Sequence, residues 1–153
     1  MIRKFKFESD LYQSLACLPM AARRKLDAVG IKIGRVDWNK LGRGERLMIC
    51  HAPADSGDEI DALKLFIADL MKSRCGSEPK ILPADIRVSA TPPDKIPDML
   101  AEAARSAGVP ISDSAWASLD ADQRYALIKL GGSPKRSHNF KQALAEFIHD
   151  AAR

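Results

Sequence analysis

The sequence predicts an all-α protein made of two tandem pseudo-repeats of short helices, packed as one domain with a Pro-rich linker between the repeats. The first observation behind this prediction is an internal echo: Gly30–Arg46 is repeated in Gly108–Arg124, at an offset of 78 residues (108 − 30 = 78). The second is that apolar residues recur at helical spacing, in stretches that end at glycine or proline.

The echo includes the only two tryptophans of the chain. Five pairs of identical residues keep the offset: Gly30/Gly108, Ile33/Ile111, Trp38/Trp116, Leu41/Leu119 and Arg46/Arg124. Further along, the offset becomes 81, so the second copy carries three extra residues (81 − 78 = 3), which we expect in a turn-rich loop. Each copy has an apolar stripe that it cannot bury alone, so we expect the copies to pack about an approximate twofold axis.

The repeat fixes the expected boundaries. One domain spans residues 1–153, with copy one at about 17–74, copy two at about 95–151 and the linker at 76–94. The elements expected in and before copy one are, in order, a brief strand or arm at 1–10, a helical stretch at 11–18, a helix at 19–29, an extended connector at 31–33, a short helix at 36–41, and helices at 45–51 and 56–74. Those expected after them are short extended pieces at 81–82 and 86–88, a helix at 96–107, a connector at 108–111, helices at 113–119 and 121–130, a loop at 131–137 and a helix at 138–151.

Several helix ends are written in capping residues. Ser56 with Glu59, and Asp120 with Gln123, have the spacing of a capping box. Gly42 replaces Asp120 in the first copy, so the helix that follows should have a looser start.

Composition indicates a soluble globular protein, with 46% apolar and 29% charged residues. No apolar run approaches the roughly 18 residues of a membrane helix. The first ten residues lack the apolar core and cleavage site of a signal peptide. Three cysteines, an odd number, argue against a disulfide framework, so we expect a cytoplasmic protein.

Positive charge is concentrated in the first copy. Residues 23–46 hold eight basic and three acidic residues, a net of +5, whereas the equivalent residues 101–124 have a net of −2. This asymmetry favours a basic binding face in copy one, although a solvated helix face would give the same pattern. The candidate partner-binding residues are Arg23, Arg24, Lys25, Lys32, Lys135, Arg136 and His138.

Several blocks together resemble the nitrate reductase-associated protein family. The blocks are LACLPMAARRKLDAVGIKI from Leu15, then Trp38, residues 123–130, His138-Asn139-Phe140 and residues 145–147. The resemblance implies a non-enzymatic accessory protein of nitrate assimilation. Its implied partner is a molybdenum-cofactor nitrate reductase or the cofactor-loading intermediate of that enzyme, whose maturation it would assist. It brings no catalytic residues and no cofactor, and the departures from it are at Gly42, Gly44 and residues 131–133.

Other functions are weaker readings of the same residues. A metal carrier would use the soft ligands Cys17, Cys50, His51 and Cys75, but these have no CxxC spacing, and buried structural cysteine is commoner. The basic residues suit a phosphate-bearing ligand, an acidic protein surface or a nucleic acid bound by an α-helical module. The last is disfavoured because aromatic residues do not alternate with the basic ones and the net charge is only +4.

The paired tryptophans and arginines favour a structural interpretation. A leucine follows each tryptophan three residues later, as in a core anchor. Arg46 and Arg124 recur at a fixed distance from the tryptophans, which favours an arginine that lies over the ring or binds a connector carbonyl. Gly30, Leu41, Gly108 and Leu119 belong to the same expected scaffold, so the better functional candidates are residues present in one copy only.

Overall fold

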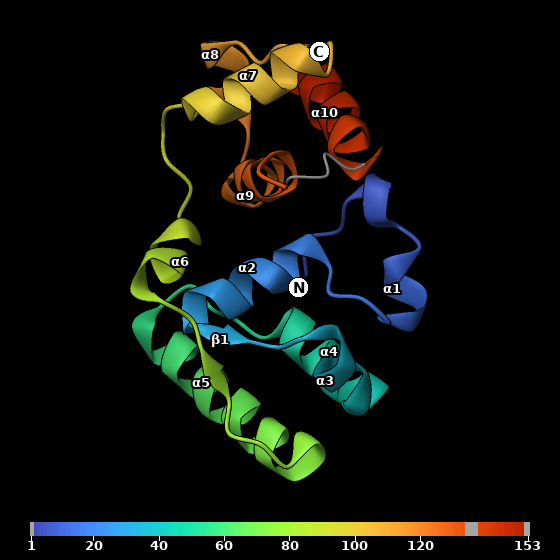
Figure 1. Ribbon diagram of the computed structural model, residues 1–153, viewed down its shortest axis with the longest axis vertical. Coiled ribbons are helices and arrows are strands. Elements are labelled where there is room, and N and C mark those ends of the chain that lie inside the picture. Colours follow the sequence, from blue (N-terminus) through green and yellow to red (C-terminus); the bar gives the residue numbers. More distant parts are fainter. Residues whose placement is uncertain (1, 134–137, 152–153) are drawn as a thin grey trace. The chain divides into compact units, whose positions relative to one another are not determined.

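The computed structural model describes residues 2–133 and 138–151, and this part of the chain is mainly helical, as predicted. Ten α-helices and a single two-stranded sheet are found in it. The chain forms two compact units: unit 1 comprises Met1–Lys4 and Glu8–Ala90, and unit 2 comprises Phe5–Phe7 and Thr91–Arg153. Figure 1 labels most of the elements.

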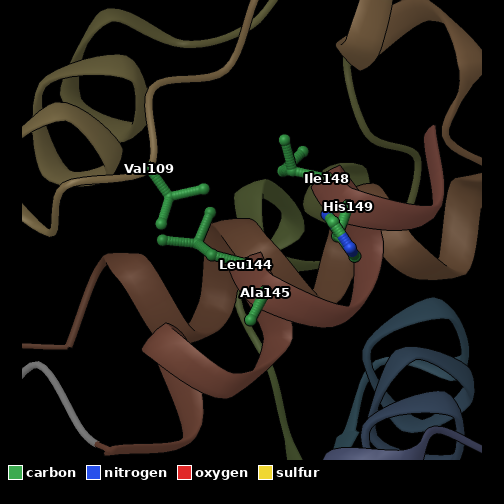
Figure 2. Close-up of a pocket in the computed structure, with 5 residues that line it drawn as sticks. All are labelled: Val109, Leu144, Ala145, Ile148 and His149. Carbon is green, nitrogen blue, oxygen red and sulfur yellow. The ribbon is translucent and has the colours of Figure 1, made fainter. Parts of the chain in front are cut away.

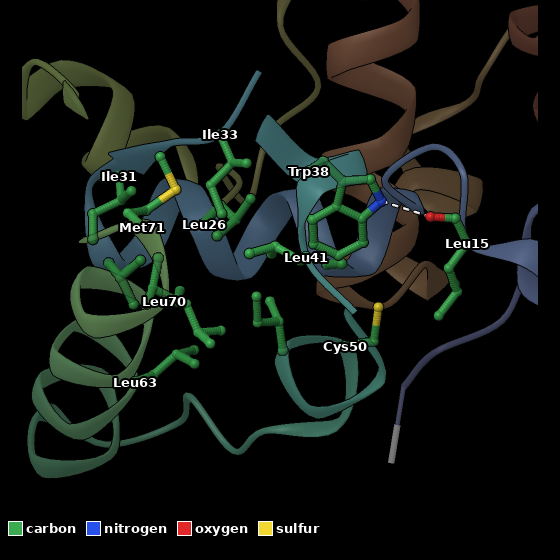
Figure 3. Packing of buried hydrophobic residues seen from close by; sticks show 14 of the residues in the cluster. Leu15, Leu26, Ile31, Ile33, Trp38, Leu41, Cys50, Leu63, Leu70 and Met71 are labelled. Carbon is green, nitrogen blue, oxygen red and sulfur yellow. Dashed lines mark hydrogen bonds between the residues drawn. The ribbon is translucent and has the colours of Figure 1, made fainter. Parts of the chain in front are cut away.

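Unit 1 contains six helices, a π-helical turn and both strands. These are α1 (Leu11–Ser14), α2 (Met20–Val29), β1 (Ile31–Lys32), α3 (Arg35–Lys40), α4 (Arg43–His51), α5 (Gly57–Leu70), the π-helical η2 (Met71–Cys75), β2 (Lys80–Ile81) and α6 (Ala84–Ser89). Helix α2 lies at the centre and contacts α4, α5, α6 and β1. Its apolar residues Leu26 and Val29 enter a core that also holds Trp38, Ile49 and Ile67, each at most 3% exposed; Figure 3 shows part of this core.

Helix α2 begins and ends for local chemical reasons. The buried carboxylate of Glu8 accepts hydrogen bonds from the Met20 backbone N–H (3.0 Å) and from the Tyr12 hydroxyl (2.6 Å), so it satisfies an amide that the first helical turn leaves unpaired. Gly30 ends the helix with φ +74°, as the sequence predicted.

The segment after η2 differs most from the sequence prediction. Residues 86–88 were expected to be extended, but they belong to helix α6, because Pro83 adopts an extended backbone and starts a helical turn with Asp85 in it. Before it, β2 pairs with β1 in an antiparallel register, with Ile31 opposite Ile81 and Lys32 opposite Lys80. Helix α6 then packs on α2.

Helix α5 starts with the predicted capping box, in which Glu59 N–H donates to Ser56 Oγ (3.2 Å) and Ser56 N–H donates to Glu59 Oε2 (3.1 Å). The predicted end at Gly76 is also confirmed, with φ +64°. The last turn, Met71–Cys75, is π-helical, which the sequence did not indicate.

Unit 2 contains four helices: α7 (Asp98–Ser106), α8 (Asp113–Ser118), α9 (Ala121–Gly131) and α10 (His138–Ala151). Helix α9 contacts α7 and α10, and α8 contacts α10. The predicted capping box of α9 is confirmed, with Gln123 N–H donating to Asp120 Oδ1 (2.9 Å) and Asp120 N–H donating to Gln123 Oε1 (3.0 Å). Gly131 is helical, and a Cβ there would lie 2.8 Å from Leu100, so only glycine fits.

The N-terminal residues do not form the brief strand that their alternation allowed. Lys6–Glu8 is a short 3-10 helix, η1. The N–H groups of Lys6 and Phe7 donate to the Glu146 carboxylate (2.9 and 3.0 Å) instead of to a neighbouring strand, and the Phe5 ring lies 5.0 Å from that of Phe147. Of the two expectations for this segment, the arm laid over a core describes it better.

Candidate binding surface

The basic residues of helix α2 have different surroundings. Arg23 is exposed. Arg24 Nε donates to the carbonyl of Ala90 (2.8 Å), at the C-terminal end of α6. Lys25 Nζ donates to the carbonyls of Cys50 (2.5 Å) and Ala52 (2.6 Å), at the end of α4. A cation at a helix C-terminus also interacts favourably with the helix dipole, so Arg24 and Lys25 hold unit 1 together.

The exposed cations of unit 1 lie at the small sheet. Lys32 and Lys80 are directly opposite each other in the antiparallel pair, which places their side chains on the same face of the ribbon. Arg35, the first residue of α3, follows three residues after Lys32. All three are exposed and have no hydrogen-bond or ion-pair partner among the described residues. We call them the ribbon cations.

Other cations nearby have anionic or carbonyl partners. The ion pairs are Arg74 with Glu45 (2.7 Å), Lys40 with Asp37 (3.4 Å) and Lys72 with Glu78 (3.6 Å). The hydrogen bond from Arg74, with a smaller contribution from the Gly42 N–H, lowers the pKa of Glu45. The ribbon cations are therefore the part of the positive charge left available to a ligand.

Sequence reasoning named Lys32 but missed Lys80 and Arg35. Lys80 lies in the segment read as a linker, and nothing local in the sequence indicates that it pairs with Lys32. Of the remaining predicted residues, His138 is exposed at the first turn of α10 in unit 2, whereas Lys135 and Arg136 lie outside the described residues.

The tryptophan and arginine pairs make hydrogen bonds to backbone carbonyls inside their own units. Trp38 Nε1 and Arg46 Nη1 both donate to the Leu15 carbonyl, at 2.6 and 2.9 Å, and Figure 3 shows the first of these bonds. In unit 2, Trp116 Nε1 donates to the Pro93 carbonyl (3.3 Å). Arg124 Nε donates to the carbonyl of Trp116 (3.1 Å), and its guanidinium lies 5.4 Å from the indole ring centre.

The cysteines and His51 do not gather into a metal site within residues 2–133 and 138–151. Cys50 is buried, and burial raises the pKa of its thiol to about 11, which disfavours the thiolate that a metal requires. Burial also raises the pKa of Cys75, with a smaller contribution from Asp37. Burial lowers the pKa of His51, whose Nδ1 accepts a hydrogen bond from Ile2 N–H (3.4 Å).

An apolar pocket of about 410 Å³ lies in unit 2 (Figure 2). It is open to one side and is lined by Val109, after α7, and by Leu144, Ala145, Ile148 and His149 of α10. Figure 2 shows Val109 pointing toward Leu144. The sequence predicted the apolar face of α10 but not that part of it lines a pocket.

The fold and these surfaces define a small, mainly helical protein that carries exposed cations and one open apolar pocket in its described part. None of the helices in that part combines the length and the apolar character needed to cross a membrane. The chain belongs to the conserved nitrate reductase-associated protein family, whose model matches residues 4–147. No curated protein and no solved structure was found to match.

Proposed function

We propose that this chain is a non-enzymatic, cytoplasmic accessory protein of nitrate assimilation. It binds a nitrate reductase, or the cofactor-loading intermediate of that enzyme, and assists its maturation. The family to which the chain belongs is described as nitrate reductase-associated, which supports an accessory role. The three cysteines support a reducing compartment.

The ribbon cations carry the binding in this proposal. Two lysines directly opposite each other repel, so their pairing costs stability in the free protein. A carboxylate placed between them would relieve this repulsion, and Arg35 adds a guanidinium suited to a second carboxylate. The partner surface is therefore acidic. Arg24 and Lys25 leave the proposed face because their side chains already bind the ends of α6 and α4.

The direct test is association of the purified protein with nitrate reductase. The double variant Lys32→Glu/Lys80→Glu should bind at least tenfold more weakly, while its far-UV circular dichroism stays unchanged. The matched control is Lys95→Glu, which makes the same kind of charge change at an exposed lysine of unit 2. Equal affinity of wild type and the double variant would remove the ribbon cations from the proposal. No association of the wild-type protein in any purified state of the reductase would remove the accessory role itself.

The maturation step has its own measurement. Reductase produced with and without this protein should differ in molybdenum content, with the lower content in its absence. Reductase fully loaded with molybdenum in both cases would rule out an assisting role, even if the two proteins associate.

We further infer that the two units derive from one duplicated ancestor. The helix starts support this, since α2/α7, α3/α8 and α4/α9 keep the offset of 78 (98 − 20, 113 − 35 and 121 − 43), and α5/α10 keep 81 (138 − 57). Both tryptophans are buried and donate to a carbonyl 23 residues earlier (38 − 15 and 116 − 93). Gly30 and Gly108 both have positive φ, +74° and +83°. An experimental structure in which these two sets of helices do not superpose would contradict the duplication.

A further inference from the structure

The pocket of unit 2 occupies a place that unit 1 fills with its own chain. At the offsets of 78 and 81 residues, Val109, Leu144 and Ile148 correspond to Ile31, Leu63 and Ile67. The three unit 1 residues are 0%, 4% and 0% exposed. In unit 2, Leu144 is equally buried, but Val109 and Ile148 remain partly exposed on the pocket wall.

Residues 80–89 are what covers the unit 1 residues. Strand β2 pairs with β1 at Ile31, the N–H of Leu82 donates to the Gly30 carbonyl (2.8 Å), and α6 packs on α2. The Arg87 side chain lies over Gly30 so closely that a Cβ on this glycine would be 2.6 Å from Arg87 Cδ.

The corresponding contacts are missing around Gly108. No described residue donates a hydrogen bond to the Gly108 carbonyl. Nothing in the described part of the chain lies within 4 Å of the position that a Cβ on Gly108 would take. The pocket, the open glycine and the unpaired carbonyl are three separate signs of one vacant place.

We propose that the unit 2 pocket binds an extended aliphatic segment of a partner protein, in the manner in which Lys80–Ser89 binds within unit 1. The segment adds as a short strand beside Val109, donates a backbone N–H to the Gly108 carbonyl and places an aliphatic side chain against Val109 and Ile148. Pro110 stands where Lys32 stands in unit 1 and has no N–H to donate. The aliphatic contacts therefore contribute more of the binding than in unit 1. The pocket volume, about 410 Å³, is in the usual range of roughly 300–1,000 Å³ for a ligand site.

This surface is distinct from the ribbon cations, and the proposal holds for any partner with such a segment. It rests on the proposed correspondence of the two units, not on the identity of the partner. The occupant is a partner protein rather than a second copy of this chain, because residues 80–89 of a second copy are already bound in its own unit 1.

The probe for the test is a synthetic peptide with the sequence of residues 78–90, EPKILPADIRVSA, titrated into the full-length protein. Binding in trans lacks the high effective concentration of a tethered segment, so we expect a dissociation constant between high micromolar and millimolar. Methyl NMR signals of Val109, Leu144 and Ile148 should shift and saturate. A peptide of the same composition in scrambled order should leave them unchanged.

Two variants of α10 make the test specific. Ala145→Arg places a long charged side chain at the pocket wall and should abolish the shifts. Gln142→Arg adds the same charge at an exposed position of the same helix that does not line the pocket, and it should leave the shifts intact. Both variants should keep the remaining NMR spectrum, which verifies the fold.

Three results would overturn the proposal. One is the absence of methyl shifts at millimolar peptide. Another is a set of shifts confined to Ile31 and Ile67, which would mean that the peptide only displaces its own copy in unit 1. The third is dimerisation of the free protein that Ala145→Arg abolishes, because the occupant would then be a second copy. None of these depends on the reductase, so the proposed function and this inference can fail separately.

Discussion

Leu15 shows how single residues hold unit 1 together. It is a non-glycine residue with φ +52°, a conformation that costs on the order of 1 kcal/mol or more. Its side chain is 2% exposed, and its carbonyl accepts hydrogen bonds from both Trp38 and Arg46. Each such bond contributes about 1 kcal/mol, so the burial and the two bonds offset the backbone strain.

The two positive-φ glycines should differ in how they tolerate a side chain. Gly108→Ala should lower the free energy of unfolding by about 1 kcal/mol, the cost of a left-handed alanine. Gly30→Ala should cost roughly 2–4 kcal/mol, because its Cβ would also collide with Arg87. Urea denaturation measures both. Gly44→Ala is the control and should stabilise by about 0.5 kcal/mol, since Gly44 lies inside helix α4 with open space around it. Equal costs at Gly30 and Gly108 would contradict the Arg87 contact.

The buried Cys50 thiol should make stability depend on alkaline pH. Its pKa is raised to about 11 in the folded protein, chiefly by burial, from an ordinary value of 9.0. Between these values the unfolded chain loses the proton first, so the stabilisation present below pH 9 falls as the pH rises, on the order of 2 kcal/mol by pH 11. Chemical denaturation from pH 8 to pH 10.5 should show a steeper decline for wild type than for Cys50→Ala. Parallel declines would mean that Cys50 ionises equally in both states.

At the scale of elements, α6 depends on a side chain from α2. Arg24 Nε binds the Ala90 carbonyl, the C-cap of α6, and the helix is only six residues long, too short to be stable without tertiary contacts. Arg24→Met should therefore cost about 1–2 kcal/mol and lower the hydrogen-exchange protection of the α6 amides. Arg23→Met is the matched control, because the neighbouring Arg23 is exposed and should leave α6 protection unchanged. Loss of protection in both variants would show that general charge, not the Ala90 bond, holds α6.

Elements fixed by chemistry close in the sequence were predictable, and those fixed by distant contacts were not. The capping boxes at Ser56 and Asp120 and the glycine stop at Gly76 each depend on residues within a few positions, and each was predicted correctly. Helix α6 was missed because its short, proline-flanked sequence has little helical periodicity and its stability comes from α2.

The candidate surfaces follow the same division. Lys32 was predictable from charge density, but its pairing with Lys80 spans 48 residues of sequence (80 − 32 = 48) and exists only because β1 and β2 meet. The roles of Arg24 and Lys25 were hidden for the same reason, since a basic residue on a helix looks alike in the sequence whether it faces solvent or a distant carbonyl.

At the scale of the whole molecule, positive charge is unequal between the units. Unit 1 has fifteen basic and twelve acidic residues, a net of +3, whereas unit 2 has nine and eight, a net of +1. A net charge of this size does not by itself produce strong steering. The local arrangement matters more, because the ribbon cations are unpaired in the described structure while most neighbouring charges are paired.

Association with nitrate reductase should therefore depend on salt through a few residues. Raising the ionic strength from about 0.05 to 0.5 M shortens the Debye length severalfold, and the association rate constant of the wild-type protein should fall roughly tenfold. Lys32→Glu/Lys80→Glu should associate slowly at low salt and lose most of this dependence, while Lys95→Glu should keep the wild-type slope. Stopped-flow or surface-based kinetics across the salt range provide the measurement. A wild-type rate constant that does not change with salt would mean that apolar contacts, such as those available at the unit 2 pocket, control the encounter instead of the ribbon cations.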